Sequence, residues 1–357
     1  MPVLSMNLSG HATREELSHF KKRPDFFIVG APKCGTTALA HYLARHPDIY
    51  MPQKEMHFFG SDLDFGRQFY RRDLNAYLAE FNRWSGQARV GEASVWYLFS
   101  KRAAEEIKAF NPDASIVILL REPSSMLYSL YYQFLFDGNE YLPSFEEALE
   151  AEHDRGLGQR IGRLTYLPKA LAYRSTAFFT EQVRRYFEIF GRERVHVIIY
   201  DDLAADTARV YRETLDFLGV SNSMDPPGRE TGGTVSVKSP VLRSILNDPL
   251  VRGTAIALRR WLPRPIFAAI QKVGNQIGSL NLAAVKRPPM AAALRISLQR
   301  EFAPEVERLS ALLGRDLTHW SRTEPLGAGQ SATCASNSDS APNSSLAPKL
   351  SDGGAPT

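Results

Sequence analysis

The strongest constraint on the fold is the stretch DFFIVGAPKCGTTALAHYL, residues 25–43, which places an apolar segment, a short loop and a helix-forming segment in succession. Gly30 and Gly35 bracket four residues of this loop. A glycine-bounded loop between a strand and a helix turns backbone N–H groups toward a phosphate-sized anion at the helix N-terminus. The stretch therefore predicts an anion-binding loop, and a glycine turn that binds no ligand is the alternative.

The lysine of this loop does not stand where an ATPase has it. In the ATPase motif G-x-x-x-x-G-K-[ST], the lysine directly follows the second glycine. Here Thr36 follows Gly35, Thr37 adds a second hydroxyl, and the lysine is Lys33, earlier in the loop. The loop therefore suits an anion, but not in the arrangement that binds the phosphates of ATP.

Beyond the loop, apolar and amphipathic segments alternate along the chain. The apolar segments 114–120 and 194–200 are typical of buried parallel strands. Helical periodicity and capping residues predict helices at residues 36–46, 100–112, 123–136, 144–152, 178–191 and 206–220. Strands that alternate with helices predict an α/β fold, with a P-loop-type parallel sheet flanked by helices on both faces.

Composition separates the remaining parts of the chain. Residues 1–23 are polar and predict a flexible N-terminal arm, and residues 323–357, which lack Val, Ile and aromatic side chains, predict a disordered tail. Residues 249–300 contain nine Lys or Arg, no Asp or Glu and several prolines, which favours a basic helical lid or insertion. An amphipathic helix is expected at 303–320. One domain is therefore predicted over residues 24–322.

Charge and cysteine content limit the class of protein. A net charge of +4 on 357 residues argues weakly for an anionic ligand and does not suggest a nucleic-acid partner. Cys34 and Cys334 give neither a disulfide framework nor a Cys/His metal pattern. Because no apolar run is long enough for a signal peptide or a membrane span, we expect a cytoplasmic protein.

A second anion-binding feature follows the strand predicted at 114–120. An ATPase usually ends this strand with an aspartate that holds Mg²⁺, whereas this chain has Arg121. Ser129 lies about two helical turns further on and can offer a hydroxyl to the same anion. We therefore expect a second anionic group bound without a metal, and an arginine paired with a local carboxylate is the alternative.

Together these residues resemble the sulfotransferases that use 3′-phosphoadenosine 5′-phosphosulfate (PAPS), in particular the heparan sulfate sulfotransferase-like branch and its bacterial relatives. The resemblance runs from about Pro24 to Trp320 and is weakest between residues 225 and 300. It implies that Arg121 and Ser129 hold the 3′-phosphate of PAPS. It also implies that the loop holds the 5′-phosphosulfate through Lys33, Gly35, Thr36 and Thr37, with backbone groups of Cys34 and Ala38.

The stretch MPQKEMHFFG, residues 51–60, contains the catalytic candidates. In the family, an acidic residue of a KE-x-HFF segment is the general base, which implies this role for Glu55, with His57 as its neighbour. A hydroxyl is a poor nucleophile until a base accepts its proton in the transition state. The resemblance thus implies in-line transfer from PAPS to a hydroxyl, with Lys33 stabilising the leaving phosphate oxygen. A solvated loop carboxylate and a structural histidine are the alternatives.

The sequence departs from the family in the segment at residues 90–100. Heparan-type enzymes have a lysine and then a proline there, where this chain has Ala93 and Val95. Glu92 stands beside them and has a structural role as its alternative. The family's late 3′-phosphate loop is hard to place, and Lys238 and Arg243 are the candidates for it.

The identity of the acceptor is left open by the sequence. The resemblance favours a carbohydrate or glycolipid hydroxyl, and the basic residues 249–300 suit either an anionic glycan or peripheral contact with an anionic membrane. A lid with a solvated basic face is the simpler explanation of this region. A divergent P-loop kinase or NTPase and an inactive adenosine-phosphate-binding member are the alternative functions.

Overall fold

The computed structural model describes residues 23–52, 55–65, 73–224, 226 and 288–322, and the backbone of residues 236–237 and 282–283. Lys238, Arg243, the tail and most of the N-terminal arm and the 249–300 region lie outside these described residues. What the sequence predicts for them therefore stays a prediction.

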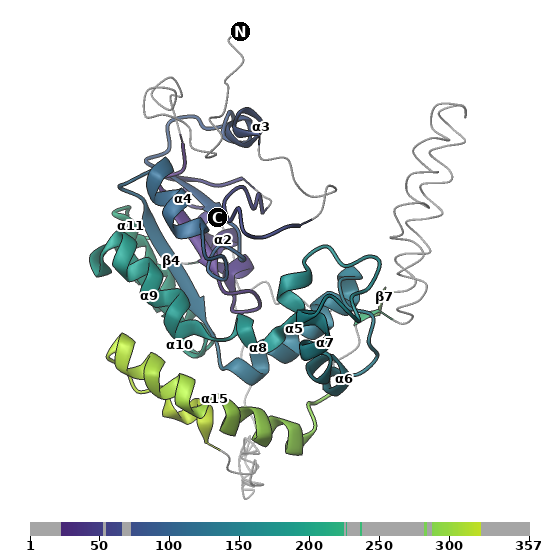
Figure 1. The fold of residues 1–357 in the computed structure, drawn as a ribbon. Helices are drawn as coiled ribbons and strands as arrows, with labels where there is room; N and C mark the ends of the chain where they lie inside the picture. Colours follow the sequence, from purple (N-terminus) through teal and green to yellow (C-terminus); the bar gives the residue numbers. More distant parts are fainter. Residues whose placement is uncertain are drawn as a thin grey trace, which may run out of the picture. The chain divides into compact units, whose positions relative to one another are not determined.

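Among the described residues, five strands form a parallel sheet in the order β2-β3-β1-β4-β5. Figure 1 labels β4 of this sheet. The strands are β1 (Phe26–Gly30), β2 (Ile49–Tyr50), β3 (Arg89–Ala93), β4 (Ser115–Leu120) and β5 (Val195–Ile199). The chain continues to one side of β1 with β2 and β3, and then to the other side with β4 and β5. Such a switch point places a binding site at the carboxyl ends of the central strands. A separate antiparallel pair joins β6 (Ser236–Val237) and β7 (Leu282–Ala283).

Helices are found at all the positions that the sequence predicted for them. The described α-helices are α2 (Thr36–Leu43), α3 (Leu74–Ala79), α4 (Ala103–Phe110), α5 (Pro123–Asp137), α6 (Phe145–Glu150), α7 (Glu152–Gly156), α8 (Tyr173–Thr176), α9 (Phe179–Phe190), α10 (Tyr200–Ala205), α11 (Thr207–Leu218) and α15 (Ala292–Leu313). Short 3₁₀ helices are η1 (Pro168–Leu171), η2 (Arg192–Arg194) and η3 (Thr318–Ser321). The predicted cap Ser144 does accept the N–H of Glu147 at 3.2 Å. Helix α4 starts later than predicted, because Ser100 Oγ accepts the N–H of Ala103 at 3.0 Å from outside the helix.

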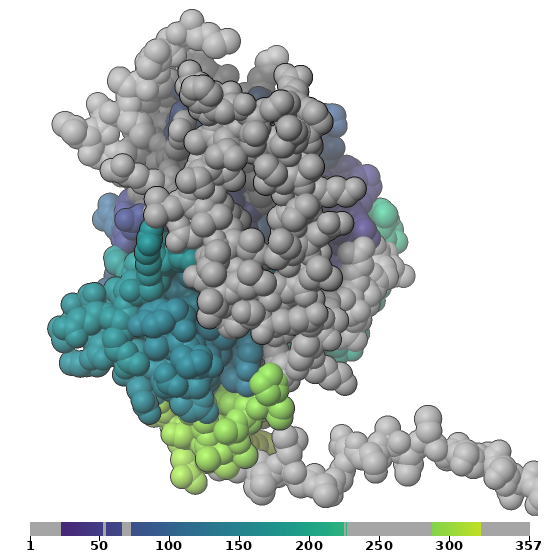
Figure 2. All heavy atoms as spheres, turned by 90° about the vertical axis from the view of Figure 1, so that its right-hand side faces the viewer, coloured from purple at the N-terminus to yellow at the C-terminus, as the bar shows by residue number. Residues whose placement is uncertain are grey.

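The C-terminal helix is longer than the sequence predicted. The expected helix began at residue 303, whereas α15 begins at Ala292 and passes through Pro304. Proline removes one helical hydrogen bond, but buried apolar side chains about one turn apart continue on both sides of it: Leu298, Phe302, Val306 and Leu309. Helix α15 packs against α5 and α9, and Figure 2 shows its yellow-green atoms directly below the teal atoms of the α5–α8 region. The helix therefore begins inside the region that was predicted to be a basic lid.

Residues after α15 attach the C-terminal part of the domain to α10. Trp320 Nε1 donates to Asp201 Oδ2 at 2.7 Å, and an Arg315 guanidinium nitrogen donates to Asp202 Oδ1 at 2.8 Å. The hydrogen bond from Arg315 holds the pKa of Asp202 below its usual range. Helix α10 is therefore held between β5 and the end of the domain. Across the described ranges, no helix has both the length and the hydropathy needed to cross a membrane.

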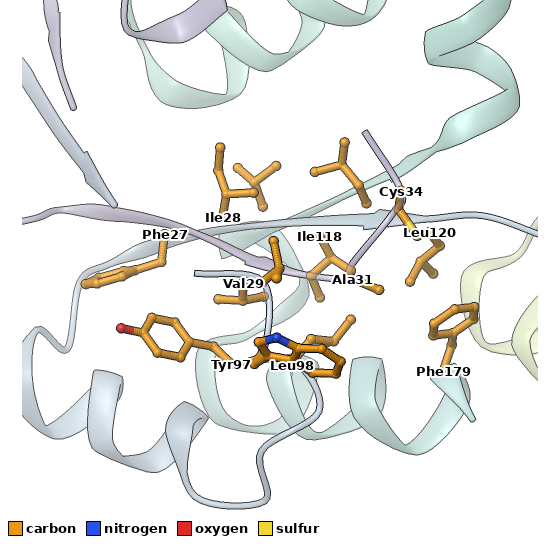
Figure 3. Close-up of a cluster of buried hydrophobic side chains, with 14 of the residues drawn as sticks. Phe27, Ile28, Val29, Ala31, Cys34, Tyr97, Leu98, Ile118, Leu120 and Phe179 are labelled. Atoms are coloured by element: carbon orange, nitrogen blue, oxygen red, sulfur yellow. The ribbon is translucent and has the colours of Figure 1, made fainter. Parts of the chain in front are cut away.

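The side chains of the central strand β1 alternate between two covered faces. Phe27 and Val29 point to the face where Tyr97 and Leu98 lie, whereas Ile28 points to the opposite face (Figure 3). The side chains of Phe27, Ile28 and Val29 are all fully buried, so both faces of the strand are covered. The predicted fold class, a parallel α/β sheet flanked by helices on both faces, is confirmed.

Candidate functional site

The loop between β1 and α2 requires both of its glycines. Gly35 has a φ of 93°, and a Cβ added there would lie 2.9 Å from Leu203 Cδ2 and 3.3 Å from the ring of Tyr200. A Cβ added to Gly30 would lie 2.6 Å from the carbonyl oxygen of Val95. Glycine therefore lets the loop approach α10 on one side and the segment after β3 on the other.

A cleft of about 960 Å³ lies beside this loop, at the carboxyl ends of the strands. Its lining includes most of the site residues that the sequence predicted, from three separate segments: Lys33, Gly35, Thr36, Thr37, Ala38, Glu55, His57, Arg121 and Ser129. The structure therefore brings the predicted anion-binding loop, the predicted base and the second anion-binding feature to one site.

Cys34 differs from its neighbours in the loop because its side chain points into the core. The thiol is fully buried, and Sγ donates to the carbonyl oxygen of Pro32 at 3.4 Å. Burial raises the pKa of the Cys34 thiol to about 12, although the nearby charges of Arg121 and Lys33 act in the opposite direction. The thiol is therefore protonated at neutral pH, and only backbone groups of Cys34 remain to face the cleft.

Two cations from different strands converge at the loop end of the cleft. An Arg121 guanidinium nitrogen donates to the carbonyl oxygen of Lys33 at 3.4 Å, and the guanidinium lies 4.5 Å from the ring centroid of Tyr200. Within the described part of the chain, Arg121 forms no ion pair with a carboxylate, so the local ion-pair alternative gains no support there. With the positive N-terminus of α2 beside them, these cations form an environment suited to an anion.

The start of α5 fixes the position of Arg121. Glu122 caps the helix by accepting the N–H groups of Ser124 and Ser125 at 3.1 and 2.8 Å, and Pro123 occupies the first helical turn. Helix α5 therefore begins directly after Arg121. The same helix presents the buried Ser129 to the cleft from its second turn.

Three residues that the sequence analysis did not predict also line the cleft. Gln133 Oε1 accepts from Lys33 Nζ at 2.8 Å, and Gln133 Nε2 donates to both carboxylate oxygens of Asp137 at 3.0 Å. Tyr166 donates to the same carboxylate at 3.4 Å, and burial together with Asp137 raises the pKa of this tyrosine well above its usual value. Ser129, Gln133 and Asp137 are spaced by one helical turn, so a shared helix face was the signal that could have indicated them.

Glu55 and His57 line the same cleft, in a segment with no helix or strand, and the charge of Glu55 contributes to the raised pKa of Tyr166. His57 Nε2 is 3.0 Å from Glu55 Oε2, and the Glu55 side chain is 40% exposed whereas that of His57 is 17% exposed. The imidazole of His57 also stacks on the ring of Phe65 at 4.6 Å between centroids. A carboxylate held in this way at the edge of a cleft can accept a proton from a hydroxyl bound there.

Glu92 is buried behind this segment, at the end of β3. Its carboxylate accepts hydrogen bonds from Tyr77 at 2.9 Å, from Tyr97 at 2.8 Å and from Ser94. Burial raises the pKa of Glu92, although these hydroxyl groups favour its ionised form. Ala93, which stands where the family has lysine, does not line the cleft among the described residues.

These features place the chain in a class of α/β proteins that bind anionic groups at a strand–loop–helix unit. Residues 23–231 match the family described as "Sulfotransferase domain", so the chain belongs to the sulfotransferase family. The described His, Cys, Asp and Glu side chains form no group of three or more that suits a metal ion.

Known relatives agree with this membership. A solved sulfotransferase from Alicyclobacillus acidocaldarius is 34% identical with a TM-score of 0.60, over 84% of this chain and 100% of that one. Mouse carbohydrate sulfotransferase 15 is 25% identical over an alignment of 281 residues that covers 65% of this chain and 49% of that protein. Mouse heparan sulfate glucosamine 3-O-sulfotransferase 3A1 is 26% identical over 200 residues, 56% of this chain and 47% of that protein. The chain thus spans about half the length of the curated relatives it matches.

Proposed function

We propose that the protein transfers the sulfuryl group of PAPS to a hydroxyl of a carbohydrate or glycolipid. The observation that supports this most is the cleft, because Lys33, Arg121 and Glu55 reach it from separate segments of the chain. Membership of the sulfotransferase family gives the type of reaction. The donor, the base and the acceptor are the parts that need experimental tests.

The loop end of the cleft fits the two anionic groups of PAPS. Lys33, Thr36 and Thr37 stand at the N-terminus of α2, where a phosphosulfate would receive backbone N–H groups as well as side-chain donors. Arg121 and Ser129 lie on the neighbouring strand–helix junction and would hold the 3′-phosphate. This arrangement supplies cationic donors from the protein, so the proposal requires no metal.

Glu55 is the proposed general base. As the acceptor oxygen forms its bond to sulfur, its proton passes to the Glu55 carboxylate, and the bond between sulfur and the bridging phosphate oxygen breaks. The electron pair of that bond leaves with adenosine 3′,5′-bisphosphate, on whose phosphate Lys33 stabilises the added negative charge. The 3.0 Å contact between His57 and Glu55 supports a role for His57 in orienting this carboxylate.

The acceptor is proposed from the relatives. Two of them are named carbohydrate or heparan sulfate sulfotransferases, which favours a glycan or glycolipid hydroxyl here. Tyr166 lines the cleft as well, and a partly exposed aromatic ring of this kind suits a sugar ring. Contact of residues 249–300 with an anionic membrane stays a prediction, because most of that region lies outside the described residues.

A thermal-shift experiment tests the donor. Adenosine 3′,5′-bisphosphate without metal should raise the melting temperature, because a ligand that binds the native state stabilises it. Stabilisation by Mg·ATP alone would instead support a kinase or NTPase. Labelled PAPS with a panel of neutral and anionic glycans and glycolipids then tests the acceptor, and an inactive member would bind nucleotide without labelling any of them.

A further inference from the structure

We propose that buried Glu92 is a positioning residue, which holds the Glu55–Phe59 segment in its reactive place by orienting the hydroxyls of Ser94 and Tyr97. The inference rests on the proposed role of Glu55 as base. It assigns a function to a residue that does not itself line the cleft and whose role the sequence left open.

The contacts run from Glu92 to the backbone of the Glu55–Phe59 segment. Ser94 Oγ donates to Glu92 and accepts the N–H groups of Met56 and His57 at 3.1 and 2.8 Å. Tyr97 donates to Glu92 at 2.8 Å and accepts the N–H of Phe59 at 3.3 Å. Each of these two hydroxyls therefore connects the carboxylate to the segment.

The carboxylate fixes the direction of these hydrogen bonds. A hydroxyl has one proton to donate and lone pairs with which it accepts. When the proton of Ser94 or Tyr97 points to Glu92, the lone pairs are left for the N–H groups of the segment. Ser94 and Tyr97 both donate to Glu92 Oε1, whereas Tyr77 donates to Oε2. A glutamine could keep its amide oxygen at the Oε1 position, so the acceptor must be removed altogether, as in Glu92→Ala, to leave both hydroxyls without it.

The segment needs such support because its backbone is strained. His57 has a φ of 45°, a left-handed conformation that is uncommon for a residue with a side chain. Strained conformations persist only where surrounding contacts fix them, and they cluster at functional sites. Ser94 accepts the N–H of His57, so one of the contacts that fix the segment is made by the strained residue itself. Loss of the Ser94 hydroxyl should therefore let the segment relax and move Glu55.

Steady-state kinetics of Ser94→Ala and Glu92→Ala test the proposal. We expect kcat at saturating PAPS and acceptor to fall about 10- to 100-fold, because a small misplacement of a catalytic group can cost this much. The affinity for adenosine 3′,5′-bisphosphate should change less than twofold, because neither Glu92 nor Ser94 lines the cleft. If Glu92→Ala does not fold, Ser94→Ala decides the question.

Ser310→Ala is the matched control. Like Ser94, Ser310 both donates and accepts through Oγ: it donates to the carbonyl oxygen of Val306 at 2.7 Å and accepts the N–H of Leu317 at 3.1 Å. It lies in α15 and does not line the cleft. It should lower the melting temperature and leave kcat unchanged. Ser94→Ala with the kcat of this control, in a folded protein, would overturn the proposal.

The double variant Glu55→Ala/Ser94→Ala separates a positioning role from a purely structural one. Because Ser94 acts through Glu55, the double variant should have the same kcat as Glu55→Ala alone. A further loss in the double variant would mean that Ser94 acts independently of the base. Wild-type turnover of Glu55→Ala would remove the base and refute the proposed mechanism, whereas an inactive Glu55→Ala with a normal Ser94→Ala would refute the positioning role only.

Discussion

Lys33 and Arg121 stand at junctions where strands β1 and β4 pass into helices, whereas Glu55 and His57 stand in a segment without regular structure. The first pair is placed by backbone geometry that a short stretch of sequence determines. The segment of the second pair is held by hydrogen bonds from its backbone N–H groups to Ser94, which follows β3 much later in the chain. The two ends of the cleft should therefore differ in how they respond to substitution.

The largest effect is expected at the base. Glu55→Ala should lower kcat by about 10²–10⁴-fold, the usual contribution of general-base catalysis, while the nucleotide still binds. Turnover with labelled PAPS and calorimetry with adenosine 3′,5′-bisphosphate measure the two quantities. Equal losses of turnover and nucleotide affinity would contradict the division of the cleft into two ends.

At the cationic end, Arg121→Ala should weaken binding of adenosine 3′,5′-bisphosphate by roughly 2–5 kcal/mol if the pair it forms with the phosphate is buried. Calorimetry at constant salt measures this change. Arg209→Ala is the control, because this arginine forms an exposed pair with Glu213 and such pairs contribute little. Unchanged affinity in Arg121→Ala would remove this residue from the nucleotide site.

A smaller effect is expected where the loop approaches α10. Gly35→Ala should cost about 1–3 kcal/mol in nucleotide affinity or stability, because the residue has positive φ and its Cβ would meet Leu203 and Tyr200. Gly86 also has positive φ, 109°, but no atom within 4 Å of an added Cβ. Gly86→Ala should therefore leave nucleotide affinity intact, and equal affinities in both variants would argue against close packing of the loop.

The smallest effect is expected for the thiol of Cys34. Its raised pKa, about 12, leaves almost no thiolate at pH 8, and thiolate is the reactive form. Iodoacetamide should therefore not modify Cys34 in the native protein and should modify it in urea, as mass spectrometry of the peptide would show. Rapid native labelling at pH 8 would mean that the side chain faces the cleft.

The residues of the cationic end could be proposed from the sequence because their determinants are local. The spacing of the two glycines marks the loop that contains Lys33. A positive charge at the end of a β-branched apolar run marks Arg121. Neither signal depends on the rest of the fold. Strand β3 was missed, because RVGEA contains a charge and a glycine and lacks an apolar run. Its Gly91 is required by the ring of Phe26, which would lie 2.1 Å from an added Cβ. Such a long-range packing constraint is not visible in a single sequence.

The same limit explains what the sequence missed around the base. From the neighbouring sequence alone, Glu92 cannot be distinguished from a solvated carboxylate. Only the burial of β3 and the three hydroxyls around Glu92 reveal its environment. Gln133 and Asp137 could have been predicted from Ser129, because the three residues share one face of the helix. The side chain of Gln133, however, is an uncharged amide and gave no charge signal.

The attachment of α10 to the C-terminal residues bears on where this catalytic unit ends. Tyr200, Leu203 and Ala204 of α10 form one side of the cleft, and the neighbouring Asp201 and Asp202 are held by Trp320 and Arg315. The family match ends at residue 231, yet a protein shortened there would lose the partners of both aspartates. A piece that keeps the partners of α10 therefore extends to Ser321, and an excised catalytic unit should be cut beyond that residue.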